Sequence, residues 1–165
     1  MKVKRLILIA LAVVVVASGL LHALGADDDL FNRTPQIDCK AFTVNNLDDD
    51  NQRIRFSLNV RARLFGKGQG ILYYEGYINY NGSDSYFART VYLSHAQRVG
   101  KDAYRYQIDD VVKSPLDQTQ EAVFDEFWSE NTADKNVLLL SVSPLTRNSY
   151  LFSSAFSPQF TCVVQ

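Results

Sequence analysis

Polar and apolar residues alternate most regularly between Arg53 and Leu64. Successive side chains of a β-strand point to opposite faces, so strict alternation predicts a strand with one buried face. The apolar face carries Ile54, Phe56, Leu58, Val60, Ala62 and Leu64. The opposite face carries Arg53, Arg55, Arg61 and Arg63, with Ser57 and Asn59 between them.

Further runs with strand character occur at 71–80, 86–96, 104–112, 137–142, 150–153 and 160–164. Gly66, Gly68 and Gly70 precede the first of these runs and favour a hairpin turn over a phosphate-binding loop, because no helix follows them. Short glycine-bearing turns between successive strands favour antiparallel pairing, since parallel neighbours need a long crossover. We expect Pro144 and Pro158 to limit the strands that contain them.

One segment, 114–131, has a helical pattern instead. Pro115 and Asp117 suit the first turn of a helix, and Gln120 follows Asp117 by three residues, as in a capping box. Apolar side chains then recur at helical spacing, at Leu116, Val123, Phe124 and Phe127. The pattern predicts one helix whose apolar face packs on the sheet.

Residues 6–24 form an uncharged, strongly apolar run after Lys2, Lys4 and Arg5. A helix of this length spans about 28 Å, close to the hydrocarbon thickness of a bilayer. Basic residues before the run predict a cytoplasmic N-terminus. We therefore expect a cytoplasmic tail at 1–5, a transmembrane signal anchor at 6–25, a stalk at 26–36 and a periplasmic β-rich domain at 37–165 of a bacterial inner-membrane protein.

The alternative for the apolar run is a cleaved secretory signal, because Ala23 and Gly25 place small residues where a signal peptidase cuts. The apolar part of such a signal is usually about 7 to 15 residues long. The greater length of this run favours an uncleaved anchor.

The sequence has two cysteines, Cys39 near the start of the predicted domain and Cys162 near its end. In an oxidising compartment this placement predicts a disulfide, with two free buried thiols as the alternative. A bridge from the first strand to the last would join the ends of a curled sheet. We therefore expect an N-terminal transmembrane helix followed by an α+β domain, mainly an antiparallel curved β-sheet or lipocalin-like barrel with one packed helix.

Charge and motifs exclude several functions. Beyond the apolar run there are 17 − 3 = 14 basic and 18 acidic residues, which argues against nucleic-acid binding. His22 falls in the apolar run and cannot meet His95, so neither is expected to act in catalysis. The acidic clusters 27–29 and 48–50 lack the ligand spacing of an EF-hand. We expect no catalytic residues, no metal and no cofactor, and thus no enzyme.

The arginines opposite the apolar face of the clearest strand are the best candidates for a binding surface. A solvent face explains them as well, because a half-exposed strand needs a polar side. The alternative is a surface for an acidic partner or an anionic amphiphile, to which exposed tyrosines would add. The candidate surface consists of Arg53, Arg55, Arg61, Arg63, Tyr73 and Tyr77.

The layout of the chain resembles the FidL-like family of small bacterial membrane proteins. The resemblance rests on the basic tail, the single apolar run, Cys39-Lys40-Ala41-Phe42, the glycine-rich hairpin at 66–76 and Phe160-Thr161-Cys162. The layout is also similar to ToxS and PsaF, the companions of ToxR-like regulators. The resemblance implies a periplasmic domain that binds a membrane-anchored ToxR-like transcriptional regulator. The alternative is a domain that binds or senses a small apolar or amphipathic ligand.

Overall fold

The computed structural model describes residues 13–19, 34–48, 52–132 and 134–165, which belong to two units divided after Arg33. The first unit contains a helix at 13–19 with exposed valines. No helix within the described ranges is long and apolar enough to cross a membrane. The predicted tail, most of the predicted anchor and most of the predicted stalk lie outside the described residues.

The second unit is a closed barrel in which eight strands follow one another in chain order, every pair antiparallel. The strands are β1 (Ile37–Asp48), β2 (Arg53–Phe65), β3 (Gln69–Tyr80), β4 (Ser83–Arg98), β5 (Ala103–Lys113), β6 (Val137–Thr146), β7 (Ser149–Ser153) and β8 (Pro158–Val164). The predicted antiparallel barrel is confirmed. Its turns include the predicted hairpin between β2 and β3.

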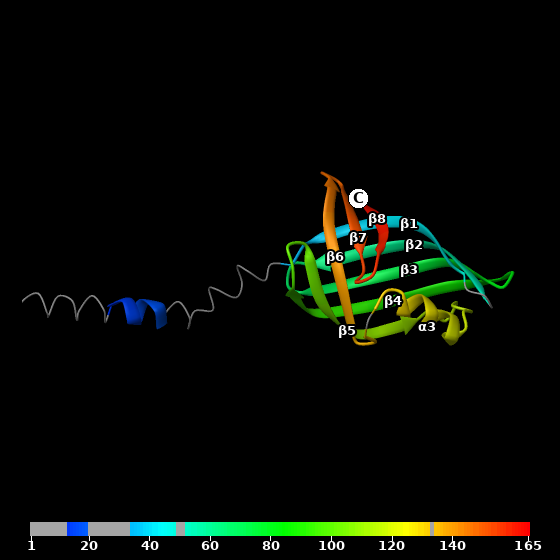
Figure 1. The fold of residues 1–165 in the computed structure, drawn as a ribbon, viewed down its shortest axis with the longest axis horizontal. Helices are drawn as coiled ribbons and strands as arrows, with labels where there is room; N and C mark the ends of the chain where they lie inside the picture. Colours follow the sequence, from blue (N-terminus) through cyan, green and yellow to red (C-terminus); the bar gives the residue numbers. More distant parts are fainter. Residues whose placement is uncertain (1–12, 20–33, 49–51, 133) are drawn as a thin grey trace, which may run out of the picture. The chain divides into compact units, whose positions relative to one another are not determined.

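The barrel closes unevenly. Strands β1 to β4 pair along most of their lengths, whereas β6, β7 and β8 cross them steeply (Figure 1). Five residue pairs join β5 to β6, and only two, Cys39 with Val164 and Lys40 with Val163, join β1 to β8. The seam between β1 and β8 is therefore the shortest ladder in the barrel.

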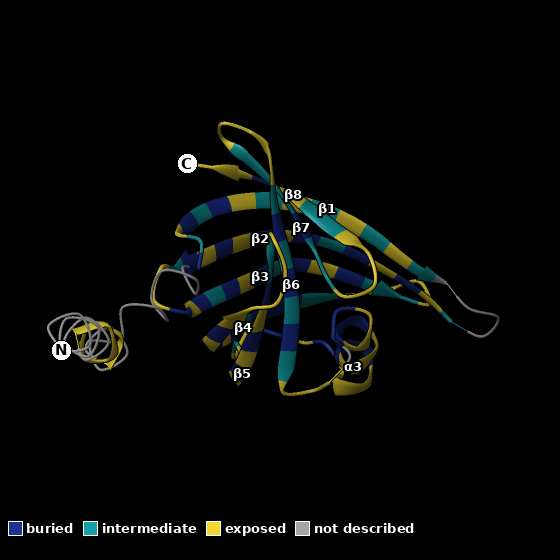
Figure 2. Ribbon diagram, turned by 60° about the vertical axis from the view of Figure 1, so that its left-hand side comes forward, coloured by how far each residue is buried: buried dark blue, intermediate teal, exposed yellow. Residues whose placement is uncertain are grey.

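The interior is filled by alternate side chains of the strands and by helix α3 (Glu121–Ser129), as the burial pattern in Figure 2 shows. Four residues of α3 are buried, Val123, Phe124, Phe127 and Trp128. The Phe127 ring centroid lies 4.9 Å from that of Phe56, 5.6 Å from that of Tyr74 and 5.8 Å from that of Phe87. The predicted helix on the sheet is confirmed, and its aromatic side chains form part of the core.

The predicted start of this helix is wrong. The helix begins at Glu121 and not near Ser114, and Leu116 is 70% exposed. Asp117 has a different role from helix capping, because its buried carboxylate accepts hydrogen bonds from the Ala88 backbone at 3.0 Å and the Thr119 backbone at 2.8 Å. These bonds hold residues 114–120 against β4 in a non-helical conformation.

Candidate functional site

The predicted disulfide is present between Cys39 on β1 and Cys162 on β8, with the two Cα atoms 5.5 Å apart. Both cysteines are fully buried. The bridge therefore fastens the short seam of the barrel from within and leaves the outer face of the strands free for other contacts.

The six residues of the predicted binding surface all lie on the outer face of β2 and β3. The register places Arg61 opposite Tyr73 and Ser57 opposite Tyr77. Arg55 and Tyr77 line the same shallow depression. All four arginines are exposed, and Tyr77 is 61% exposed. The structure thus brings Arg55 close to Tyr77 and places Arg61 opposite Tyr73, six residues further along β2.

Two of these arginines already have an acidic neighbour on β1. The Asp38 carboxylate accepts hydrogen bonds from Arg61 at 3.0 and 2.9 Å and forms an ion pair with Arg63 at 3.2 Å. The hydrogen bonds from Arg61 lower the pKa of Asp38 below its usual value, and the same contact raises the pKa of Arg61. Arg55 forms no ion pair with a described residue. Arg53 likewise forms no ion pair with a described residue, so the uncompensated positive charge of this surface lies at the Arg53 and Arg55 end of β2.

Two further residues of this surface were not predicted from the sequence. Phe42 and Val44 on β1 are 65% and 43% exposed on the outer face, although both are strongly apolar. Val44 pairs with Ser57, which in turn pairs with Tyr77. The alternation within β1 could have indicated them. Phe42 and Val44 are an odd number of residues from Cys39, so they point to the opposite face from this buried cysteine. We name Phe42, Val44, Arg55, Arg61, Tyr73 and Tyr77 the β1–β3 face.

The tyrosines of this region are held by one carboxylate. The Tyr86 hydroxyl donates to Glu75 Oε1, and the ring of Tyr86 packs edge to face against Tyr77 with centroids 5.7 Å apart. The hydrogen bond to Glu75 raises the pKa of Tyr86 to about 12. Burial, with a smaller effect of Glu75, raises the pKa of Tyr73. These phenols therefore stay neutral at physiological pH and offer the flat, amphipathic surface that protein interfaces favour.

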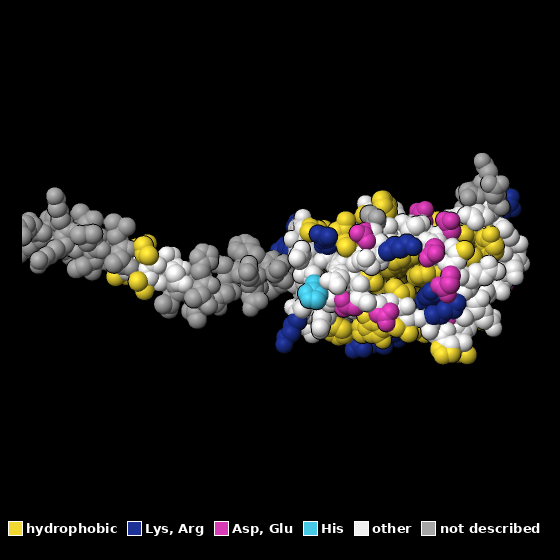
Figure 3. All heavy atoms as spheres, turned by 90° about the horizontal axis from the view of Figure 1, so that it is seen from below, with side chains coloured by type: hydrophobic (Ala, Val, Ile, Leu, Met, Phe, Trp, Pro, Cys, Tyr) yellow, Lys and Arg dark blue, Asp and Glu magenta, His cyan; other side chains and the backbone are white. Residues whose placement is uncertain are grey.

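On the face shown in Figure 3, acidic and basic side chains are interspersed around an apolar area. A partly buried ion-pair cluster joins β4 and β5 to the segment that contains α3. Arg89, which is 4% exposed, pairs with Asp117 at 3.2 Å and Glu121 at 2.8 Å, and Lys113 pairs with Glu121 at 2.8 Å. This cluster satisfies its own charges and fixes the helix to the barrel.

The second candidate site lies where β4 and β5 both have register irregularities. His95 has a φ of 50° and lies where the register of β4 shifts, between Ser94 and Gln97. Asp109 is the extra residue at the neighbouring register shift, on β5. Bulges of this kind redirect side chains and are common next to functional sites. The Ser94 hydroxyl contacts both residues, at 2.6 Å from Asp109 Oδ1 and 2.7 Å from His95 Nδ1.

This arrangement differs from a catalytic triad. A hydroxyl has one proton, so Ser94 that donates to Asp109 must accept from His95 Nδ1. The serine lies between the acid and the imidazole, whereas a triad places the imidazole in the middle. The chain of bonds orients the imidazole and leaves its Nε2 atom for another partner. The His95 residue as a whole is exposed.

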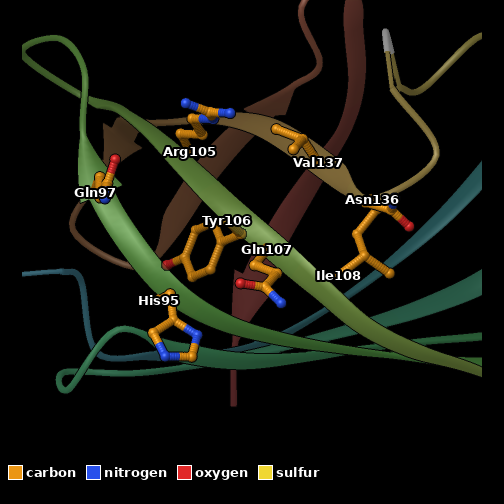
Figure 4. Close-up of a pocket in the computed structure, with 8 residues that line it drawn as sticks. All are labelled: His95, Gln97, Arg105, Tyr106, Gln107, Ile108, Asn136 and Val137. Atoms are coloured by element: carbon orange, nitrogen blue, oxygen red, sulfur yellow. The ribbon is translucent and has the colours of Figure 1, made fainter.

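A cavity of about 400 Å³ lies beside this histidine (Figure 4). Its lining residues come from β4, β5 and the start of β6, and they are His95, Gln97, Arg105, Tyr106, Gln107, Ile108, Asn136 and Val137. The imidazole of His95 and the amide of Gln107 extend in the same direction from neighbouring strands. No pattern of residue types predicts this cavity, because it lies beside the two register irregularities of β4 and β5.

The remaining candidates do not form sites within the described residues. His22 and the acidic residues 27–29, 49 and 50 lie outside those residues, and Asp48 ends β1. No group of three or more His, Cys, Asp or Glu side chains in the described parts of the chain could hold a metal ion.

The fold and the two candidate sites define the class of the domain as a small, disulfide-closed antiparallel β-barrel with an aromatic and basic outer face. Residues 76–162, more than half of the chain, match the family described as "FidL-like putative membrane protein", and the chain belongs to this family. The match runs from β3 through α3 to the second cysteine of the disulfide. No curated protein matches the chain.

Proposed function

We propose that the chain is a non-enzymatic, single-pass accessory protein of the bacterial inner membrane. In this proposal residues 6–25 anchor the chain, residues 1–5 are cytoplasmic, and the barrel lies in the periplasm. There the barrel binds a membrane-anchored ToxR-like transcriptional regulator and stabilises it or modulates its activity. The charge-free run 6–24, the disulfide and a family described as membrane proteins support this topology.

The observation that carries the proposal is the exposed aromatic and basic composition of the β1–β3 face. Interfaces between proteins are enriched in aromatic residues and arginine, and a few such side chains supply most of the binding energy. Phe42 and Tyr77 are both more than 60% exposed and lie two strands apart on one face. Covering one large apolar side chain contributes about 1.5 to 3 kcal/mol, so a partner that covers both gains a substantial part of a binding energy.

A shared membrane would make a modest interface sufficient. Two proteins anchored in the same bilayer meet at a high effective concentration, so association needs less intrinsic affinity than it would between free domains. The aromatic residues of the face supply apolar contact area, and Arg55 supplies a charge for an acidic group of the partner. The proposed anchor is therefore part of the binding mechanism as well as of the localisation.

A second candidate function is the binding of a small apolar or amphipathic ligand. A cavity of about 330 Å³ opens between β1, α3 and the start of β8, and the rings of Phe56 and Phe127 contribute to its lining. The volume is at the lower end for small-molecule sites. The aromatic side chains of α3 already occupy the barrel interior, which favours the outer face as the main binding region.

Co-purification from membranes tests the proposal. The full-length chain is co-expressed with a one-pass ToxR-like regulator of the same organism, and the regulator is tagged on its cytoplasmic side. We expect the chain to co-purify, and we expect Phe42→Ser and Tyr77→Ser each to reduce its recovery at least about tenfold, the effect of losing about 1.4 kcal/mol. Regulator levels should fall when the gene for the chain is deleted.

The matched control is Leu145→Ser, which removes an apolar side chain that is 54% exposed on β6, outside the β1–β3 face. This variant should be recovered like the wild type. Equal recovery of all three variants, or no association with normal regulator levels after deletion, would show that the face does not bind a regulator.

A further inference from the structure

We infer that the chain forms a symmetric dimer in which the open edge of β1 pairs with β1 of a second copy. The dimer needs no regulator and is separate from the proposed function. Three features of β1 point to it. One edge of the strand lacks a ladder, that edge has none of the usual protection, and its sequence complements itself in an antiparallel register.

The edge of β1 that faces β8 is unpaired beyond Lys40. β1 pairs with β2 along its whole length, but with β8 only at Cys39 and Lys40. Alternate residues of a paired strand direct their N–H and C=O groups away from the partner, so half of residues 41–48 direct these groups away from β2. One described hydrogen bond joins this stretch to β8, from the Thr43 hydroxyl to the Gln159 carbonyl. In Figure 1, β1 extends past β8.

Burial agrees with an uncovered edge. On β2 the inward-facing side chains, from Ile54 to Leu64, are at most 1% exposed. On β1 the inward-facing Cys39 is fully buried, whereas every residue of 41–47 is at least partly exposed (Figure 2). The cavity of about 330 Å³ lies between residues 44–47 and the start of β8. This half of β1 is thus paired on one side and open to solvent on the other.

The open edge of β1 has none of the residues that usually prevent strands from pairing. Proteins protect such edges with charged side chains, proline or bulges. Residues 41–47 contain no charge, proline or glycine, and they pair with β2 without a bulge. Residues 109–113 of β5 form a comparable stretch, beyond the ladder with β6, but they include two aspartates and a lysine. The open stretch of β1 is therefore the better suited of the two to pair with another strand.

This stretch complements itself when two copies pair antiparallel with Val44 opposite Val44. Phe42 then lies opposite Asn46 of the second copy, and no charged residues meet within the ladder. Just beyond its ends, Lys40 comes level with Asp48, so residues of opposite charge are neighbours on both sides of the two-fold axis. Phe42 and Val44 are both exposed on the outer face, and in this register they form one apolar cluster with the same residues of the second copy.

The ladder would extend the sheet of β1 to β4 into the second copy and bring two β1–β3 faces side by side. Seven residue pairs, from 41–47 of each copy, make a small contact compared with a standard interface of about 800 Å² per partner. We therefore expect a weak dimer in dilute solution. In cells, the proposed membrane anchor would raise the effective concentration of the two copies and favour pairing.

Cysteine cross-linking in intact cells tests the register. The full-length chain is expressed without any ToxR-like regulator, and the native cysteines stay in their buried disulfide. Opposite residues of an antiparallel pair have Cβ atoms about 4.5 to 5.5 Å apart, so a small movement allows a disulfide. Val44→Cys should therefore give a covalent dimer on mild oxidation.

Two further cysteine variants make the cross-link specific. Asn46→Cys alone should give little dimer, because the two Asn46 positions are four residues out of register, about 14 Å apart. Phe42→Cys alone should behave in the same way. Co-expression of Phe42→Cys with Asn46→Cys should give the mixed dimer, because these two positions lie opposite each other.

A charge exchange provides the second test, with the yield of this mixed dimer as the readout. Val44→Lys in both copies places like charges at the two-fold axis and should lower the yield at least about fivefold, the effect of about 1 kcal/mol. Val44→Lys in one copy with Val44→Glu in the other should restore it. Val112→Lys is the matched control, because Val112 on β5 is 44% exposed and Val44 is 43% exposed.

Two results would overturn the dimer. The first is a Val44→Cys cross-link no stronger than that of Asn46→Cys. The second is a mixed-dimer yield that falls no more with Val44→Lys than with Val112→Lys, which would mean that the cross-links arise from random collisions. Failure of the regulator proposal has a different signature. Tyr77→Ser tests regulator recovery and should leave the Val44→Cys cross-link unchanged.

Discussion

The guanidinium carbon of Arg89 lies 4.0 Å from the centroid of the Phe124 ring, and this contact joins β4 to α3 inside an otherwise apolar region. The same guanidinium pairs with Asp117, whose side chain is completely buried. A buried charge that loses its partner is strongly destabilising, because it keeps its desolvation cost without compensation. The position of the helix therefore depends on one arginine.

Arg89→Met should lower the free energy of unfolding by about 3 to 5 kcal/mol, because it removes the buried cation that contacts Asp117 and leaves this buried carboxylate only Lys113, at 4.0 Å. Arg89→Lys should cost less, since it keeps the charge but loses the two-pronged contact with Glu121. Urea unfolding followed by tryptophan fluorescence measures both, because Trp128 is on α3. Arg147→Met, at an exposed turn, should change stability by less than about 0.5 kcal/mol. A similar small effect of Arg89→Met would contradict the assigned role.

The carboxylate of Glu121 gives stability a defined pH dependence. Hydrogen bonds from Arg89 and then from Lys113 lower the pKa of Glu121 from its usual 4.5 to about 2. Because the folded state has the lower pKa, the ionised carboxylate stabilises the fold above about pH 4.5, and this contribution is lost as the pH falls toward 2. The side chain is 61% exposed, so solvent screening keeps the contribution below about 1 kcal/mol.

Glu121→Gln should therefore be slightly less stable than the wild type between pH 5 and 8, and the difference should shrink progressively below about pH 4.5. Urea midpoints measured across this range test the prediction. Glu130→Gln, an exposed change just after α3, serves as the control. A difference that stays constant down to pH 2.5 would show that the Arg89 and Lys113 contacts do not lower the pKa of Glu121.

The sequence was sufficient to predict the strands because their information is local. Alternation in β2, from Ile54 to Leu64, specifies one buried face, and the turns at Gly68 and Gly82 separate the strands. The same local reasoning gave a wrong prediction at Asp117. Its sequence context is typical of a helix start, but its carboxylate instead forms a long-range hydrogen bond to the backbone of β4. Local propensity is overridden when a side chain finds a stronger partner elsewhere in the chain.

The same distinction between local and long-range information applies to the two candidate sites. The outer position of Arg55 and Tyr77 followed from alternation alone. The cavity beside His95 did not, because it needs a positive φ at a histidine, a second bulge at Asp109 and a buried Tyr106 from the next strand. Nothing in the residue types at these positions predicts a bulge. Such sites become visible only when the register of the strands is known.

Gly76 on β3 provides a test of the packing between strands. A Cβ atom at this position would collide with the backbone carbonyl oxygen of Ser57 on β2. Backbone cannot move away as a flexible side chain can, so Gly76→Ala should separate the strands and lower the melting temperature by more than about 5 °C. Gly66→Ala is the matched control, because its Cβ would lie 3.9 Å from the nearest atom. Equal melting temperatures for both variants would contradict the observed register of β2 and β3.

The short seam between β1 and β8 makes the disulfide a major part of the barrel's stability. Only two residue pairs form the ladder between β1 and β8, with one further hydrogen bond from the Thr43 hydroxyl to the Gln159 carbonyl. The bridge from Cys39 to Cys162 spans a sequence separation of 123. Closing a loop of this length restricts the unfolded chain by an amount worth about 5 kcal/mol in the chain-entropy model. The double variant Cys39→Ala/Cys162→Ala removes the bridge without burying a new polar group. It should unfold at a much lower urea concentration than the oxidised wild type.

A reductant supplies the internal control for this prediction. Reduction should lower the stability of the wild type toward that of the double variant and should leave the double variant unchanged. Hydrogen exchange should rise first at the seam, at Lys40 and Val163, because the adjoining ladders of β1 with β2 and β7 with β8 remain paired. Uniform exchange throughout the barrel would instead mean that the bridge stabilises the whole fold through the unfolded state alone. Equal stability of the oxidised protein and the double variant would contradict both interpretations.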